Sequence, residues 1–188
     1  MKKAIQLSPE FSKALFELGN SYNNLAMYQD AIDPLEKAIM INSLYSDAHL
    51  ALGLANSKIE KYDQAIVHLK KAMDLNPNQT KAYYPLGLSL IRLGRFEDAA
   101  VQLNKTKTGN PDYPNVQNQL GLGFWKLKKY PEAIIFFKKA IKANPDFTAP
   151  YTHLGSLYKI LEDYQPAIKY LKESINQEPN NPETHYNL

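Results

Sequence analysis

A 34-residue internal repeat constrains this chain more than any other feature. The dipeptide Leu-Gly returns at that interval, at residues 18–19, 52–53, 86–87, 120–121 and 154–155. An alanine stands twelve residues after each of these glycines, and an aromatic residue stands three residues before each alanine. These alanines are Ala31, Ala65, Ala99, Ala133 and Ala167, and the aromatic residues are Tyr28, Tyr62, Phe96, Tyr130 and Tyr164. Repeats of this length indicate similar supersecondary units that stack on one another.

Each repeat carries two helical patterns. In the second copy Ala48, Leu52 and Ala55 recur at steps of three and four residues, and a second such series begins at Tyr62. These steps place apolar side chains on one face of a helix. Asn-Pro or Glu-Pro pairs follow the second helix of several copies and end it. Because one hairpin cannot bury its apolar stripe alone, the copies are expected to stack into an all-α solenoid of antiparallel hairpins.

Two local features refine this prediction. The repeated glycine lies inside the first helix, where it costs about 1 kcal/mol relative to alanine. A helix accepts this cost where two backbones must approach closely, here the two helices of a hairpin. A hydroxyl residue stands where each of four first helices is expected to begin, and is predicted to cap its free amide groups. These residues are Ser12, Ser46, Thr80 and Thr148.

The columns Leu-Gly, aromatic residue, alanine, a second small residue and proline resemble the tetratricopeptide repeat (TPR). The resemblance covers the whole chain and implies one right-handed superhelical solenoid over residues 1–188. It implies complete repeats at 12–45, 46–79, 80–113, 114–147 and 148–181, the tail of another repeat at 1–11 and the start of a further one at 182–188. From these partial repeats we expect the chain to be part of a longer protein.

The third copy departs from the pattern. It reads Thr106-Lys107-Thr108-Gly109 where the other copies have an alanine followed by an apolar residue. We therefore expect its second helix to be shorter, and the segment 106–114 to be softer. Pro34 and Pro85 lie about one turn inside their helices, where each removes a hydrogen bond.

The residue types and their spacing argue against catalysis and metal binding by this chain. There are no cysteines, and no two of the four histidines have the helical spacing that would place both on one metal ion. No nucleophile or acid–base pair has an evident partner. The sequence therefore predicts no catalytic, cofactor-binding or metal-binding residues, and no enzyme activity.

The charge and the apolar runs exclude two further classes of function. A net charge of +3 is low for a dedicated nucleic-acid binder, so no nucleic-acid partner is expected. The longest apolar runs are too short to span a bilayer, and no signal peptide follows Met1. We expect a cytoplasmic chain with no integral membrane segment.

The resemblance also implies where a partner binds. A helical wheel separates the packing stripe of each first helix from a second face, and in the TPR family that second face lines a concave groove. Carried across the copies, it holds apolar side chains in the middle and basic side chains at the rim. The predicted groove residues are Phe16, Asn20, Leu50, Leu54, Tyr84, Leu88, Ile91, Arg92, Leu122, Trp125 and Lys126. This composition favours a peptide or helical segment with apolar anchors and acidic flanks.

Three functions are compatible with these features. The first is a non-catalytic scaffold that binds a protein or peptide partner in its groove. The second is the accessory TPR region of a protein-modifying glycosyltransferase. The third is an assembly factor at a membrane or organelle surface that self-associates through exposed repeat ends.

Overall fold

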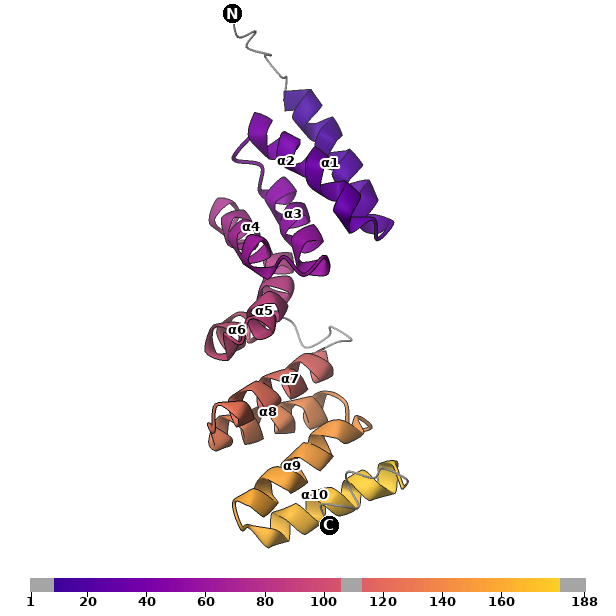
Figure 1. Cartoon of the computed structure of the whole chain (residues 1–188), viewed down its shortest axis with the longest axis vertical. Helices are drawn as coiled ribbons and strands as arrows, with labels where there is room; N and C mark the ends of the chain where they lie inside the picture. The colour runs from indigo at the N-terminus through magenta and orange to yellow at the C-terminus, as the bar shows by residue number, and fades with distance from the viewer. Residues whose placement is uncertain (1–8, 106–112, 180–188) are drawn as a thin grey trace, which may run out of the picture. The chain divides into compact units, whose positions relative to one another are not determined.

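The computed structural model of the chain describes residues 9–105 and 113–179. The chain divides into two compact units, which separate after Thr106 (Figure 1). The predicted partial repeats at the two ends lie outside the described residues, except for residues 9–11. These three residues belong to the first helix.

The first unit consists of three helix hairpins in chain order. Neighbouring helices pack antiparallel, and each hairpin packs on the next (Figure 1). The elements are α1 (Pro9–Asn24), α2 (Tyr28–Ile41), α3 (Ser46–Lys58), α4 (Tyr62–Leu75), the 3-10 turn η1 (Thr80–Ala82), α5 (Tyr83–Arg92) and α6 (Phe96–Leu103).

The second unit consists of two hairpins of the same kind. Its helices are α7 (Tyr113–Lys126), α8 (Tyr130–Ala143), α9 (Thr148–Ile160) and α10 (Tyr164–Gln177). Helix α8 packs against both α7 and α9, and α9 packs against α10. No strand occurs in the described parts of either unit, so the predicted all-α solenoid of antiparallel hairpins is confirmed.

The glycine column lets the two helices of each hairpin touch. A methyl group built on Gly53 of α3 would lie 2.6 Å from Cγ of Leu69 of α4, well inside van der Waals contact. Leu69 is fully buried, and so are Ala65 and Ala72, the small residues of the same helix. The same contact recurs in every hairpin. The pairs are Gly19–Leu35, Gly53–Leu69, Gly87–Leu103, Gly121–Phe137 and Gly155–Leu171.

Each hairpin turn is formed by one residue in the left-handed conformation. In the second hairpin this residue is Glu60, and the next backbone N–H, that of Lys61, donates to the carbonyl of Asn56 at 2.9 Å. This bond satisfies a free carbonyl at the end of the first helix. The equivalent residues are Ala26, Glu60, Gly94, Lys128 and Glu162. Only one of them is glycine, so residue type alone does not reveal the turn.

The predicted capping by hydroxyl residues is wrong. Neither α3 nor η1 nor α9 has a side-chain hydrogen bond at its N-terminus, and α1 begins at Pro9 instead of Ser12. The Ser46 hydroxyl instead donates to the carbonyl of Ala72 at 2.9 Å, and Ser12 donates to the carbonyl of Ala38 at 3.0 Å. Both carbonyls lie in the last turn of the second helix and also accept the N–H of the capping residue, Asn76 or Asn42, so the hydroxyl adds a second hydrogen bond.

The third repeat is irregular at both of its helices. Helix α6 has 8 residues, whereas α4 has 14, so the predicted shortening is confirmed. Most of the segment expected to be soft, residues 106–112, lies outside the described residues. The first turn of the other helix is the 3-10 turn η1. Pro85 explains this turn, because it has no N–H to donate to the carbonyl of Lys81 in an α-helical bond.

The contact between Gly53 and Leu69 predicts a specific pattern of stabilities. Gly53→Ala should lower the free energy of unfolding by about 1–3 kcal/mol, because the new methyl group overlaps the Leu69 side chain. Leu69→Ala alone should cost about 2–5 kcal/mol through the cavity that it leaves.

The double variant tests whether the two effects share this one contact. The methyl group of Ala at position 53 would fill part of the cavity left by Leu69, so the double variant should lose less than the sum of the single variants. Urea unfolding followed by circular dichroism measures all three values. Additive losses would show that the glycine is required for another reason.

Candidate first-helix face

The first helices of the first unit form one continuous layer. Helix α1 contacts α3, and α3 contacts α5. Side chains on the same face of these three helices therefore lie on adjacent rows. Of the predicted groove residues in this unit, five are half-buried, Arg92 is exposed, and Leu50 and Ile91 are buried. The half-buried residues are Phe16, Asn20, Leu54, Tyr84 and Leu88.

Burial divides these predicted groove residues into two roles. Leu50 and Ile91 are 8% and 9% exposed, so most of their side-chain area already packs against the chain itself. They support the face instead of offering surface to a partner. The half-buried side chains retain accessible apolar area, which a partner can cover.

The Phe16 ring is held in place by a neighbouring tyrosine. Its centroid lies 4.9 Å from that of Tyr45, in a tilted contact. Burial raises the pKa of Tyr45, and the nearby charges of Asp47 and Glu17 raise it further. The phenol therefore stays neutral, which keeps this contact apolar at physiological pH.

Side-chain hydrogen bonds tie the rows of the layer together. Asn23 of α1 donates to the carbonyl of Ala51 of α3 at 2.9 Å. The hydroxyl of Ser89 of α5 lies 3.1 Å from that of Ser57 of α3. These bonds fix the register of the helices, so the face is formed before a partner binds.

In the second unit Trp125 is the centre of an aromatic cluster. Its ring is half-buried and stands edge-on to Phe137 and to His153, with centroids 6.2 and 6.3 Å apart. Nδ1 of His153 lies 2.9 Å from the amide oxygen of Asn118. Because an amide oxygen only accepts, His153 donates through Nδ1–H. We call Trp125, Phe137, His153 and Asn118 the Trp125 cluster.

The remaining predicted residues of this unit lie on the same helix as Trp125. Leu122 is half-buried and Lys126 is exposed. The predicted groove set is thus divided between the units. Residues 16 to 92 lie on the first unit and residues 122 to 126 on the second. His153 was not among the predicted groove residues. Its hydrogen bond to Asn118 joins two different helices, and a helical wheel of one helix does not show such a contact.

The structure also joins two histidines that lie too far apart in the sequence to share one helix face. Nδ1 of His49 on α3 lies 3.1 Å from Nδ1 of His68 on α4, and their rings stack. Nε2 of His49 lies 3.2 Å from the carbonyl oxygen of Ser43. Since a carbonyl only accepts, His49 carries its proton on Nε2, and its Nδ1 accepts a hydrogen bond from Nδ1–H of His68.

Both imidazoles of this pair favour the neutral form. Burial lowers the pKa of His49 below its ordinary value of 6.5, and Lys71 lowers it further, against the opposing effect of the Ser43 carbonyl. Burial and the neighbouring His49 lower the pKa of His68. The described residues contain no group of three or more His, Asp or Glu side chains that could hold a metal ion.

With this geometry established, comparison with known families identifies the class of protein. Models of the tetratricopeptide repeat match residues 12–43, 59–120, 114–147 and 149–181. The chain therefore belongs to the TPR family. No curated protein matches the sequence. None of the described helices is long and apolar enough to cross a membrane.

Solved TPR structures share the fold. YrrB, described as a TPR protein with an unusual peptide-binding site, is 20% identical with a TM-score of 0.79, covering 98% of this chain and 95% of its own. MamA is 25% identical with a TM-score of 0.73, covering 86% of this chain and 94% of its own. MamA from Desulfovibrio magneticus RS-1 is 18% identical with a TM-score of 0.73, and the match covers 91% of this chain and 97% of the MamA chain.

The histidine pair predicts a loss of stability in acid. Below about pH 6.5 the unfolded chain binds protons at both histidines, whereas the folded chain, with lowered pKa values, binds fewer. The free energy of unfolding should therefore fall as the pH decreases from about 7.5 to about 5.5. Urea unfolding at both pH values measures this fall.

His68→Gln provides the comparison, because it removes one titrating ring and leaves the rest of α4 unchanged. Its stability should fall less than that of the wild type over the same pH range. An equal fall in both proteins would show that other groups cause the acid sensitivity.

Proposed function

We propose that this chain is a non-catalytic scaffold that binds a peptide or helical segment of a partner protein on its first helices. We call the accessible predicted groove residues of α1, α3 and α5 in the first unit, and those of α7 in the second unit, the first-helix face of that unit. One observation carries the proposal: a layer of half-buried apolar side chains is fixed in register by hydrogen bonds between its helices. A face formed in advance reduces the ordering cost of binding. The peptide-binding site described for YrrB supports the same class of function.

The side chains of this face define the chemistry of the partner. Tyr84 and Leu88 in the first unit, and Leu122 and Trp125 in the second, offer apolar contact area. An exposed basic side chain, Arg92 in the first unit and Lys126 in the second, follows these residues at the end of the same helix. A partner with apolar anchors and acidic flanks complements both features.

Removing one aromatic anchor from each unit tests this proposal. The wild-type chain is immobilised, its partner is identified by mass spectrometry, and the affinity of the purified partner is measured by calorimetry. Tyr84→Ala and Trp125→Ala should each weaken binding by about tenfold, which corresponds to about 1.4 kcal/mol, because large aromatic side chains dominate interface energies.

A matched control uses an aromatic residue outside this face. Tyr164 begins α10 and is 59% exposed, so Tyr164→Ala removes a similar side chain without touching the first-helix face. Its affinity should equal that of the wild type. If the Tyr84/Trp125 double variant bound as tightly as the wild type, the first-helix face would not be the binding site.

Self-association is a second candidate function, and two exposed leucines at the start of the first unit favour it. Leu18 of α1 and Leu25, which directly follows α1, are seven residues apart and are 47% and 70% exposed. The N–H of Leu25 still donates to the carbonyl of Ser21 at 3.1 Å, so the helical path extends to Leu25. Seven residues are about two helical turns, so the two side chains lie on one side. Burial of these leucines against a second copy would stabilise a dimer.

Charged substitutions at these leucines test self-association. Size-exclusion chromatography with light scattering should give a dimer or larger species for the wild type. It should give a monomer for the Leu18→Glu/Leu25→Glu variant, because two carboxylates cannot be buried unpaired. A wild-type monomer at high concentration would rule out self-association.

A further inference from the structure

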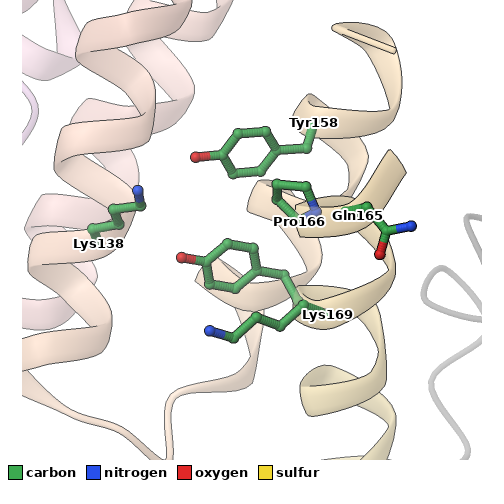
Figure 2. Close-up of a pocket in the computed structure, with 6 residues that line it drawn as sticks. Lys138, Tyr158, Gln165, Pro166 and Lys169 are labelled. Atoms are coloured by element: carbon green, nitrogen blue, oxygen red, sulfur yellow. The ribbon is translucent and has the colours of Figure 1, made fainter. Parts of the chain in front are cut away.

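A cavity of about 490 Å³ opens between three helices of the second unit (Figure 2). None of its lining residues belongs to the predicted groove set. One residue comes from α8, one from the end of α9 and four from the first two turns of α10. They are Lys138, Tyr158, Gln165, Pro166, Lys169 and Tyr170.

Parallel aromatic rings form one wall of this cavity. The rings of Tyr158 and Tyr170 are inclined by only 2°, with centroids 5.8 Å apart. Nζ of Lys138 lies 5.9 Å from the centroid of Tyr158. Figure 2 shows the Tyr158 hydroxyl and the Lys169 amine pointing towards the side where Lys138 stands. Hydrogen-bond donors from three helices therefore face one opening.

The two lysines have no acidic partner among the described residues. No carboxylate lies within ion-pair distance of Lys138 or Lys169 in the described parts of the chain. This includes Glu162 and Asp163, which directly precede α10. The ammonium groups thus create a local positive potential that a bound anion can neutralise.

Comparison of the repeats shows that the charge of Lys169 and the lack of acids beside it are specific to the α9–α10 hairpin. At the two positions equivalent to Gln165 and Pro166, every other copy carries at least one acidic residue. These acids are Asp30, Asp63, Glu97, Asp98 and Glu132. The position of Lys169 holds no other basic residue, since its equivalents are Asp33, Val67, Val101 and Ile135.

We propose that this cavity binds an Asp- or Glu-rich segment of a partner protein. The ammonium groups and the tyrosine hydroxyls can all donate hydrogen bonds, and a carboxylate accepts them. The cavity is much larger than a single anion, and its aromatic wall offers contact to the aliphatic part of an acidic side chain. Both features favour a peptide over inorganic phosphate. The site is separate from the first-helix face and does not depend on it.

A model peptide tests this site directly. The probe is a fluorescein-labelled peptide of glycine and glutamate, Gly-Glu-Glu-Gly-Glu-Glu, and the control peptide has glutamine in place of every glutamate. Fluorescence anisotropy with the full chain at low salt should show binding of the glutamate peptide only. In ¹⁵N–¹H spectra, its addition should shift the amide signals of α10 around Gln165 to Tyr170.

Substitution of the lysines gives the decisive comparison. The Lys138→Gln/Lys169→Gln double variant should bind the glutamate peptide at least tenfold more weakly than the wild type. Lys172→Gln, which removes an exposed lysine of α10 outside the cavity, should change the affinity for this peptide less than twofold. All three side chains are exposed, so the variants should fold, and circular dichroism verifies this.

Three results would overturn the proposal. The first is equal binding by the lysine double variant, and the second is equal binding of the glutamine peptide. The third is absence of peptide binding while inorganic phosphate shifts the amide signals around Gln165 to Tyr170, which would identify a small-anion site. Trp125→Ala separates this site from the first-helix face, because it should leave binding of the glutamate peptide unchanged. A loss as large as that in the lysine double variant would place the peptide on that face.

Discussion

The close approach of two helices at a glycine is the contact on which each hairpin depends. Where Gly53 meets Leu69, the leucine side chain occupies the space that any Cβ atom would need. The same glycine would otherwise destabilise a helix interior, so packing outweighs propensity at this position. Because the contact recurs in each of the hairpins, it fixes the spacing and rotation of their helices and leaves the other faces of the first helices free to vary.

Because the hairpins share one geometry, a difference in residue type at an equivalent position changes the local contacts. The positions of Tyr158 and Tyr170 are those of Phe124 and Phe136 one repeat earlier, and both pairs stack nearly parallel, at 5.8 and 5.1 Å between centroids. Three repeats earlier the second position of the pair holds His68, which bonds to another histidine instead. The same position of the second helix thus takes part in an aromatic stack in two hairpins and in a histidine pair in another, and the residue types decide which.

The sequence predicts the architecture well, because the features that define it lie within one helix. Helical periodicity and the 34-residue interval identify the hairpins, and the Thr106 to Gly109 departure correctly indicates the short α6. Features that depend on two helices are missed. Ser46 is opposite the end of α4 and donates to its carbonyl, although its position along the chain suggested an N-cap.

The same distinction explains the histidine pair and the burial pattern that the sequence does not reveal. His49 and His68 are 19 residues apart, so a search for metal-binding spacing on one helix cannot pair them. The separation of the predicted groove residues into buried and half-buried ones also depends on neighbouring helices, as with Leu50. The left-handed turn residues escape prediction for another reason: four of the five are not glycine.

The arrangement on α8 shows how one unit can offer two separate binding surfaces. Phe137 is fully buried and supports Trp125, while the next residue, Lys138, is exposed and lines the cavity beside Tyr158. Consecutive residues of a helix point about 100° apart, so one short segment serves both surfaces without either side chain entering the other site. A partner on the Trp125 cluster would then contact Trp125 of α7, which Phe137 supports from beneath, and an acidic segment in the cavity would contact Lys138 of α8. A substitution of Lys138 would therefore change the charge of the cavity and leave the packing of Phe137, on which the hairpin depends, the same.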